Sequence, residues 1–205
     1  MNYGEIRTQF KAILNRRDCS DALADTFLNQ SLQRCTRELR VTSQEAVATL
    51  TVADPYVGLP VPSGIQQIIA VTAAVASGVS RKLKQLPLSL FLEQDAAYTG
   101  SPVYYARIGS YLQFRPTPAE GTELTLYYYG DFEPFANDSS ETELSLIASD
   151  LLIYGALSYA ADYFMDDRGQ AFEARYVQIA QALQDQAYDL EAHDAAVSPP
   201  YNAEY

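Results

Sequence analysis

The stretch from Ser149 to Leu190 reads SDLLIYGALSYAADYFMDDRGQAFEARYVQIAQALQDQAYDL, and the spacing of its apolar residues decides the fold. Its first half repeats at helical intervals, in Leu151, Leu152, Tyr154, Leu157, Ala161 and Phe164. After a break at residues 166–170 a second helical repeat follows, in Phe172, Tyr176, Ile179, Ala180, Leu183, Ala187 and Leu190. Two such helices joined by a tight turn bury their apolar stripes against each other. The stretch therefore predicts an antiparallel helical hairpin.

Local signals predict where the two helices of this hairpin begin. Ser149 is the expected N-cap of the first, with Asp150 in the first turn, where a carboxylate suits the helix dipole. Asp167, followed three residues later by Gln170, resembles a capping box and predicts the start of the second helix.

The first forty residues predict two further helices. Asn2 and Glu5 have capping-box spacing and open the first, and Ser20 or Asp21 caps the second. Their apolar faces are Ile6, Phe10, Ile13 and Leu14 in the first helix, and Leu23, Phe27, Leu28, Leu32, Cys35 and Leu39 in the second. Arg34, Arg37 and Arg40 fall on or near the opposite side of the second helix. They form either a solvated face with partners such as Glu38 or a cationic strip that meets an acidic neighbouring subunit.

From Glu45 the apolar period changes to two, which is typical of strands. We expect strands at residues 45–51, 65–75, 79–83, 103–108, 111–115 and 122–129, with a tight hairpin turn at Gly109-Ser110. A short helix is expected at residues 87–95, with Leu88, Phe91 and Leu92 inward. The basic residues Arg81, Lys82 and Lys84 are typical of an edge strand that resists aggregation. Tyr127, Tyr128 and Tyr129 place aromatic rings on both faces of one strand.

These elements predict an α+β fold: a helical bundle, made of the N-terminal helices plus the C-terminal helical hairpin, with a mainly antiparallel β-sheet insertion of five to seven strands. We expect residues 1–193 to form one domain, with helices at 3–40 and 145–193 and a β-rich middle at 44–130. Residues 194–205 are expected to form an extended C-terminal arm, because Pro199-Pro200 cannot continue a helix.

The composition of the chain limits the classes of function that it can have. The 205 residues are 48% hydrophobic, which excludes wholesale disorder, and carry a net charge of −12, which argues against a surface that grips nucleic acid. The chain has 16 tyrosines and no tryptophan, and a high tyrosine content favours a role in protein–protein contact. Two cysteines make no disulfide scaffold, no signal peptide is visible, and prolines interrupt the longest uncharged run at residues 56–80. We therefore expect folding in a reducing cytosol and no membrane span.

The sequence offers no specific catalytic motif. It contains no Gly-rich phosphate loop, no G-x-S-x-G and no H-E-x-x-H, and its single histidine, His193, cannot supply a zinc site. Asp162 and Asp166, four residues apart on the expected helix, could share a face and bind a divalent cation, with Asp167 nearby. Solvated acids at a helix end are the more economical interpretation. We expect no catalytic, cofactor-binding or metal-binding residues, and a protein that is not an enzyme.

Several motifs, in order along nearly the whole chain, resemble the head-to-tail adaptor (connector) proteins of tailed bacteriophages. They are Tyr3-Gly4-Glu5-Ile6, the helix ending Arg37-Glu38-Leu39-Arg40 before the strand that begins at Glu45, Leu59-Pro60, residues 100–105, Leu112-Gln113-Phe114-Arg115-Pro116-Thr117-Pro118, and Asp150-Leu151-Leu152-Ile153-Tyr154-Gly155-Ala156-Leu157. The resemblance implies a ring of twelve copies under the portal protein at the capsid–tail junction of a virion, made in the host cytoplasm. The ring joins the portal to a tail nozzle or tail-completion protein, and DNA passes through its channel without specific binding.

A ring needs two different patches on each subunit. The candidate subunit interface comprises Arg34, Arg37, Tyr127, Tyr128 and Tyr129, and the candidate portal-docking arm contains Ser198, Pro199, Pro200, Tyr201 and Tyr205. Two alternatives stay open at this point. One is a soluble non-viral ligand-binding or regulatory α+β domain that uses the Tyr-rich sheet, and the other is a hydrolase with a metal at Asp162 and Asp166.

Overall fold

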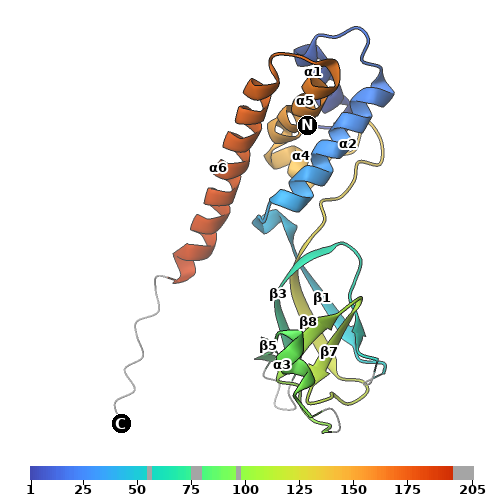
Figure 1. Ribbon diagram of the computed structural model, residues 1–205, viewed down its shortest axis with the longest axis vertical. Coiled ribbons are helices and arrows are strands. Elements are labelled where there is room, and N and C mark those ends of the chain that lie inside the picture. The colour runs from blue at the N-terminus through green and yellow to red at the C-terminus, as the bar shows by residue number, and fades with distance from the viewer. Residues whose placement is uncertain (55–56, 75–79, 96–97, 196–205) are drawn as a thin grey trace. The chain divides into compact units, whose positions relative to one another are not determined.

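The computed structural model describes residues 1–54, 57–74, 80–95 and 98–195, with side chains up to residue 189. The chain divides into two compact units (Figure 1). Residues 1–43 and those from Phe132 onward form the helical unit, and residues 44–131 form the β unit. The α+β class predicted from the sequence is confirmed.

The helical unit contains α1 (Tyr3–Leu14), α2 (Asp21–Glu38), α4 (Glu143–Ile147), α5 (Ser149–Phe164) and α6 (Gly169–Ala195). Helix α5 packs against each of the other four, so it is the central helix of the unit. Its buried residues are Leu151, Leu152, Ile153, Gly155, Ala156, Leu157, Ala160 and Ala161. This set covers more of the helix circumference than the predicted stripe, as expected for a helix that is covered on several sides.

The N-terminal helices begin where the sequence predicts. Asn2 and Glu5 form the capping box of α1, and Asn15 ends that helix in the left-handed conformation, with φ 53°. Ser20 caps α2 by accepting from the backbone N–H of Leu23 at 3.2 Å. The first backbone N–H groups of α1, at Tyr3 and Gly4, donate to carbonyls of the loop at residues 138–140, at 3.0 and 2.9 Å. These bonds satisfy N–H groups at the start of α1 that have no acceptor within the helix.

Two predicted caps of the hairpin are wrong in detail. The N-cap of α5 is Ala148, without a side-chain hydrogen bond, and Ser149 is already the first helical residue. The preceding short helix α4 ends at Ile147, so Ala148 alone separates the two helices and serves as both the C-cap of α4 and the N-cap of α5. Helix α6 begins at Gly169, so Asp167 lies two residues before the first helical residue and is not the N-cap. In this turn the carboxylate of Asp166 accepts from the backbone N–H of Arg168 at 3.0 Å.

The β unit forms two four-stranded sheets where one sheet was predicted. Sheet A has the strand order β1-β8-β3-β4 and sheet B the order β2-β7-β6-β5. The strands are β1 (Glu45–Thr51), β2 (Leu59–Pro60), β3 (Ile65–Ala74), β4 (Ser80–Lys82), β5 (Lys84–Gln85), β6 (Tyr104–Ile108), β7 (Tyr111–Arg115) and β8 (Glu123–Gly130), with a 3-10 turn η1 (Thr42–Gln44) before β1 and a short helix α3 (Leu88–Leu92). All pairs except β5–β6 are antiparallel.

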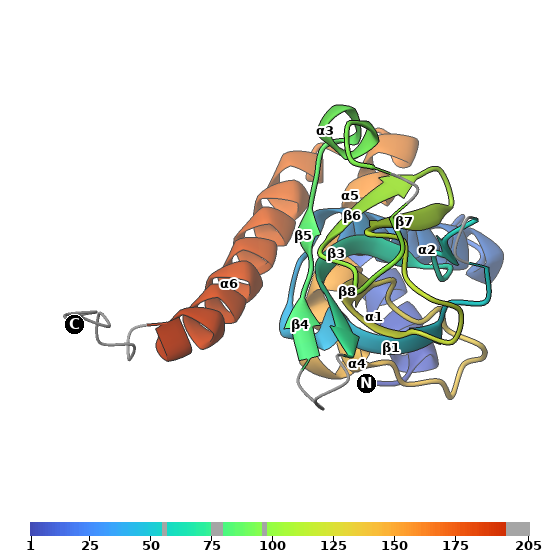
Figure 2. The ribbon, with the colours of Figure 1, turned by 90° about the horizontal axis from the view of Figure 1, so that it is seen from below.

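The inner faces of both sheets share one core. Val71, Leu124 and Leu126 of sheet A are buried with Leu112 and Phe114 of sheet B. The chain passes from one sheet to the other at Leu83: its N–H donates to a carbonyl of sheet A at 2.8 Å, whereas the next N–H donates to the carbonyl of Val103 at 2.9 Å. Figure 2 shows β4 and β5 following each other along one line. A period-two pattern predicts which residues of a strand share a face, but it does not predict which strands pair with each other. The sequence therefore did not predict the division into two sheets.

Candidate interaction surfaces

Arg34 of the candidate interface is engaged inside the helical unit. Its Nη1 and Nη2 donate to both carboxylate oxygens of Glu173 on α6, at 2.8 and 2.6 Å, and its Nε donates to Glu38 at 2.9 Å. The guanidinium lies 3.9 Å from the ring centroid of Tyr176. The side chain of Arg34 is 15% exposed. The pair with Glu38, named in one of the two alternatives, is present, and the two bonds to Glu173 join α2 to α6.

The surroundings of this ion pair shift several pKa values. Hydrogen bonds from Arg34 lower the pKa of Glu173 to about 2, although partial burial opposes the shift, and the Ser158 hydroxyl donates to the same carboxylate at 2.7 Å. The bond to Glu173 likewise raises the pKa of Arg34. Burial raises the pKa of Tyr176, whose hydroxyl donates to Glu38 at 2.9 Å. The pair is therefore charged at every physiological pH.

The other two arginines of this segment, Arg37 on α2 and Arg40 just beyond its end, differ in how accessible their guanidinium groups are. Arg40 folds back over the end of α2, where its Nη1 donates to the carbonyls of Thr36 at 3.2 Å and of Leu39. A cation at this position satisfies carbonyl groups that the last helical turn leaves free. Arg37 is exposed, so its guanidinium is accessible to a neighbouring molecule.

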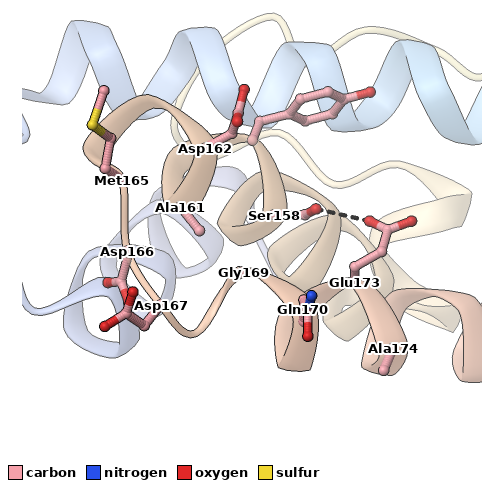
Figure 3. Close-up of a pocket in the computed structure, with 11 residues that line it drawn as sticks. Ser158, Ala161, Asp162, Met165, Asp166, Asp167, Gly169, Gln170, Glu173 and Ala174 are labelled. Carbon is pink, nitrogen blue, oxygen red and sulfur yellow. Dashed lines mark hydrogen bonds between the residues drawn. The ribbon is translucent and has the colours of Figure 1, made fainter.

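The two aspartates that could have formed a metal site do not share a helix. Helix α5 ends at Phe164, and Met165 adopts φ 52°, so Asp166 lies beyond the helix end. Figure 3 shows Asp162 on the helix and Asp166 and Asp167 on the turn. Arg168 binds Asp166 through Nη2 and Nε, at 2.6 and 3.0 Å, and this lowers the pKa of Asp166 to about 2. The prediction that Asp162 and Asp166 share a helical face is therefore wrong.

These acids border an open groove of about 1030 Å³ between α5 and α6 (Figure 3). Asp162 and Met165 line it on one side, and Gln170 and Glu173 on the other. Across the described residues, no group of three or more His, Cys, Asp or Glu side chains is placed to hold a metal ion. The groove thus offers exposed carboxylates and one exposed methionine rather than a closed coordination site.

The tyrosines of β8 point to opposite faces of sheet A. Tyr127 is 40% exposed and pairs with Val47 of β1, itself 61% exposed, and with Ala70 of β3. Tyr128 is half-buried against the core, between Ala46 and Ile68. Because successive residues alternate, Tyr129 shares the outer face with Tyr127. Only the outer-face tyrosines remain suited to contact another subunit.

The short helix α3 presents an exposed apolar surface that the sequence did not predict. Phe91 is fully buried, with the Arg115 guanidinium 4.7 Å from its ring centroid. Leu88 and Leu92, expected inward, are 48% and 65% exposed, and Leu90 is 48% exposed. A five-residue helix lying on the sheet buries only the residue that points directly at it. The three leucines thus form a projecting apolar surface anchored by Phe91.

The candidate portal-docking residues Ser198, Pro199, Pro200, Tyr201 and Tyr205 lie outside the described residues, as does the side chain of His193. No helix within the described ranges combines the length and apolar character that a membrane crossing needs.

Exposed tyrosine, leucine and methionine side chains, such as those described above, are typical of proteins that work by docking to other proteins. These surfaces therefore indicate an assembly component. The chain belongs to the SU10 adaptor protein family, whose family model matches residues 1–200. This is a family of phage head-to-tail adaptor proteins, which are structural components of the virion. The resemblance seen in the sequence is thereby confirmed. A comparison with curated protein sequences gives no match.

Proposed function

We propose that this protein assembles into a ring of twelve copies that joins the portal to the tail nozzle or tail-completion protein, with a central channel for DNA. The observation that carries the proposal is the family match over residues 1–200, which spans both units. An adaptor between two unlike neighbours must present separate surfaces to each of them and to its own copies. The exposed surfaces on both units supply candidates for these contacts.

Subunit contacts in this proposal use the members of the predicted interface that lie on the outer faces of the two units. Tyr127 and Tyr129 lie on the outer face of sheet A, and Arg37 is exposed on α2. Arg34 and Tyr128 instead stabilise the subunit, because the first is bound to Glu173 and the second packs on the core. Since a ring interface is heterologous, the two patches need not resemble each other.

The acidic charge is concentrated in one part of the chain. Residues 141–205 contain twelve acidic residues against two basic ones, Arg168 and Arg175, a net charge of −10. The whole chain carries −12, so the C-terminal helices hold most of the excess. We place this acidic segment toward the channel, where like charge lets DNA slide without binding.

The test is assembly with the portal protein. Purified protein, alone and mixed with the portal, is examined by native mass spectrometry and negative-stain imaging. Closed rings, either spontaneous or induced by the portal, support the proposal, and a persistent monomer that ignores the portal refutes it.

A truncation tests the C-terminal arm separately. Deleting residues 198–205 should leave the melting temperature unchanged and weaken attachment to the portal. Unfolding on deletion would instead assign these residues to the core, and unchanged attachment would refute the docking role.

A further inference from the structure

The four sheet edges of the β unit are unequally protected against pairing. Strands β2, β4 and β5 are two or three residues long, and they carry Pro60, Arg81 with Lys82, and Lys84 respectively. Short length, proline and lysine are the features by which natural sheets discourage pairing at an edge. Strand β1 has seven residues and a single charge, at Glu45. Among the strands that the structure describes, β1 is thus the one long edge that lacks this protection.

Edge β1 is also open to solvent. In the part of the chain that the structure describes, β8 is the only strand that pairs with β1. The inward residues Ala46, Ala48 and Leu50 are only half-buried, whereas Leu124 and Leu126 on β8 are fully buried. A covering strand beside β1 would bury these residues and satisfy its outward backbone groups.

The two edges of sheet A carry opposite charge. Arg81 and Lys82 are exposed on β4. At the other edge, Glu45 begins β1, and Glu123 of β8 pairs with Thr51 at its end. Glu120 lies beside that same end, because the next residue donates its N–H to the carbonyl of Val52 at 2.9 Å. Opposite charges on two edges of one sheet complement each other between copies, but repel when like edges meet.

We propose that sheet A continues from one subunit to the next, with edge β4 of one copy pairing antiparallel with edge β1 of a second copy. This proposal rests on the proposed ring. Neighbouring strands in sheet A alternate in direction throughout, so β1 and β4 run in opposite directions. A second copy added in the same orientation therefore places its β1 antiparallel to β4. The contact is heterologous and propagates around a ring.

The basic residues of β4 gain a second role in this arrangement. They keep two β4 edges apart and select an acidic edge instead. Lys82 lies in one row across the sheet with Thr72, Thr125 and Thr49. At strand spacings of about 4.8 Å, Lys82 at the seam lies about 10 Å from the neighbour's β8, within side-chain reach of Glu123.

Disulfide trapping tests the seam. The native cysteines, Cys19 and Cys35, are buried, so background cross-linking is low. Lys82→Cys is combined with Val47→Cys, Thr49→Cys or Thr51→Cys in separate variants, because the seam register can shift by two residues. Rings formed with the portal are oxidised and run on a denaturing gel.

At least one double variant should give a ladder of cross-linked multimers, and each single variant should stay monomeric. Dimers from Thr49→Cys alone would indicate β1–β1 pairing and overturn the proposal. Rings without a ladder from any double variant would also overturn it and leave the proposed function intact. If the wild-type protein forms no ring, the proposed function fails, and this inference fails with it.

A charge exchange gives an independent readout. Lys82→Glu should weaken ring formation about tenfold, and adding Glu123→Lys should restore it. Arg107→Glu, on the inner strand β6, is the matched control and should have no effect. Equal effects of Lys82→Glu and Arg107→Glu would count against the seam.

Discussion

Removing Arg34 should destabilise the helical unit in a way that depends on pH. Its guanidinium makes two hydrogen bonds to Glu173, at 2.8 and 2.6 Å, and one to Glu38 at 2.9 Å, and it lies over the Tyr176 ring. Arg34→Met keeps the aliphatic contact with the ring and removes every charged bond. The substitution therefore isolates the electrostatic link between α2 and α6.

The expected loss of stability in Arg34→Met depends on how exposed the ion pair with Glu173 is. Hydrogen bonds to charged groups contribute about 1.5–3 kcal/mol when buried. The side chain of Glu173 is 40% exposed, so solvent screening reduces this contribution. We expect Arg34→Met to lower the free energy of unfolding by about 2 kcal/mol. Lys11→Met, which breaks the pair with Asp21 whose side chains are 33% and 70% exposed, is the control and should cost about 0.5 kcal/mol or less.

The pH dependence of the free energy of unfolding shows whether the ion pair with Glu173 causes the loss of stability. The pKa of Glu173 is about 2 in the folded chain and 4.5 ordinarily, so its contribution is present above pH 4.5 and lost as the pH falls toward 2. Urea unfolding at pH 7, 4 and 3 should show wild-type stability falling across this window, and Arg34→Met should lose less. A double-mutant cycle with Glu173→Gln should give a coupling energy of about 1 kcal/mol or more. Near-zero coupling, or equal costs for Arg34→Met and Lys11→Met, would refute the reasoning.

Three further experiments test the packing of the two units, two by substitution and one by thiol labelling. Gly155→Ala places a Cβ 2.3 Å from Ser31 Oγ and 3.1 Å from the Tyr176 ring. Despite alanine's better helix propensity, the melting curve should therefore show a loss of about 1–3 kcal/mol, and an unchanged curve would mean that the Ser31 and Tyr176 side chains move aside without cost. Tyr128→Ala should cost about 2–3 kcal/mol in stability, whereas Tyr127→Ala should leave the melting temperature unchanged and weaken ring formation; the reverse pattern would exchange their assigned faces. Burial raises the pKa of the Cys35 thiol to about 12, so Ellman's reagent at pH 8 should react only after unfolding, and rapid labelling of the native protein would contradict its burial.

The sequence predicted the elements of this fold well because their signals are local. Asn2 with Glu5, and Ser20, cap the helices that they open. The turn at Gly109-Ser110 joins β6 to β7, with Ile108 paired to Tyr111, as expected of a two-residue hairpin. Each of these features depends on residues within about four positions of one another.

Features that depend on distant parts of the chain were not predictable in the same way. Arg34 and Glu173 are 139 residues apart, and no periodicity relates them. The alternation along β8 places Tyr127 and Tyr128 on opposite faces but does not say which face is buried, and the structure assigns the inner one to Tyr128. On α3, residue type suggested burial of Leu92, whereas the length of the helix leaves it exposed.

Strand order changes what the basic residues of β4 mean. From the sequence alone, Arg81 and Lys82 indicate an edge that avoids pairing, and their exposed position at the edge of sheet A agrees with that interpretation. The order β1-β8-β3-β4 adds that the opposite edge is long, open and bordered by acids. A basic edge alone only prevents aggregation, but a basic edge opposite an acidic one on the same sheet also specifies a partner. The same lysine can therefore block the wrong contact and favour the contact that builds a ring.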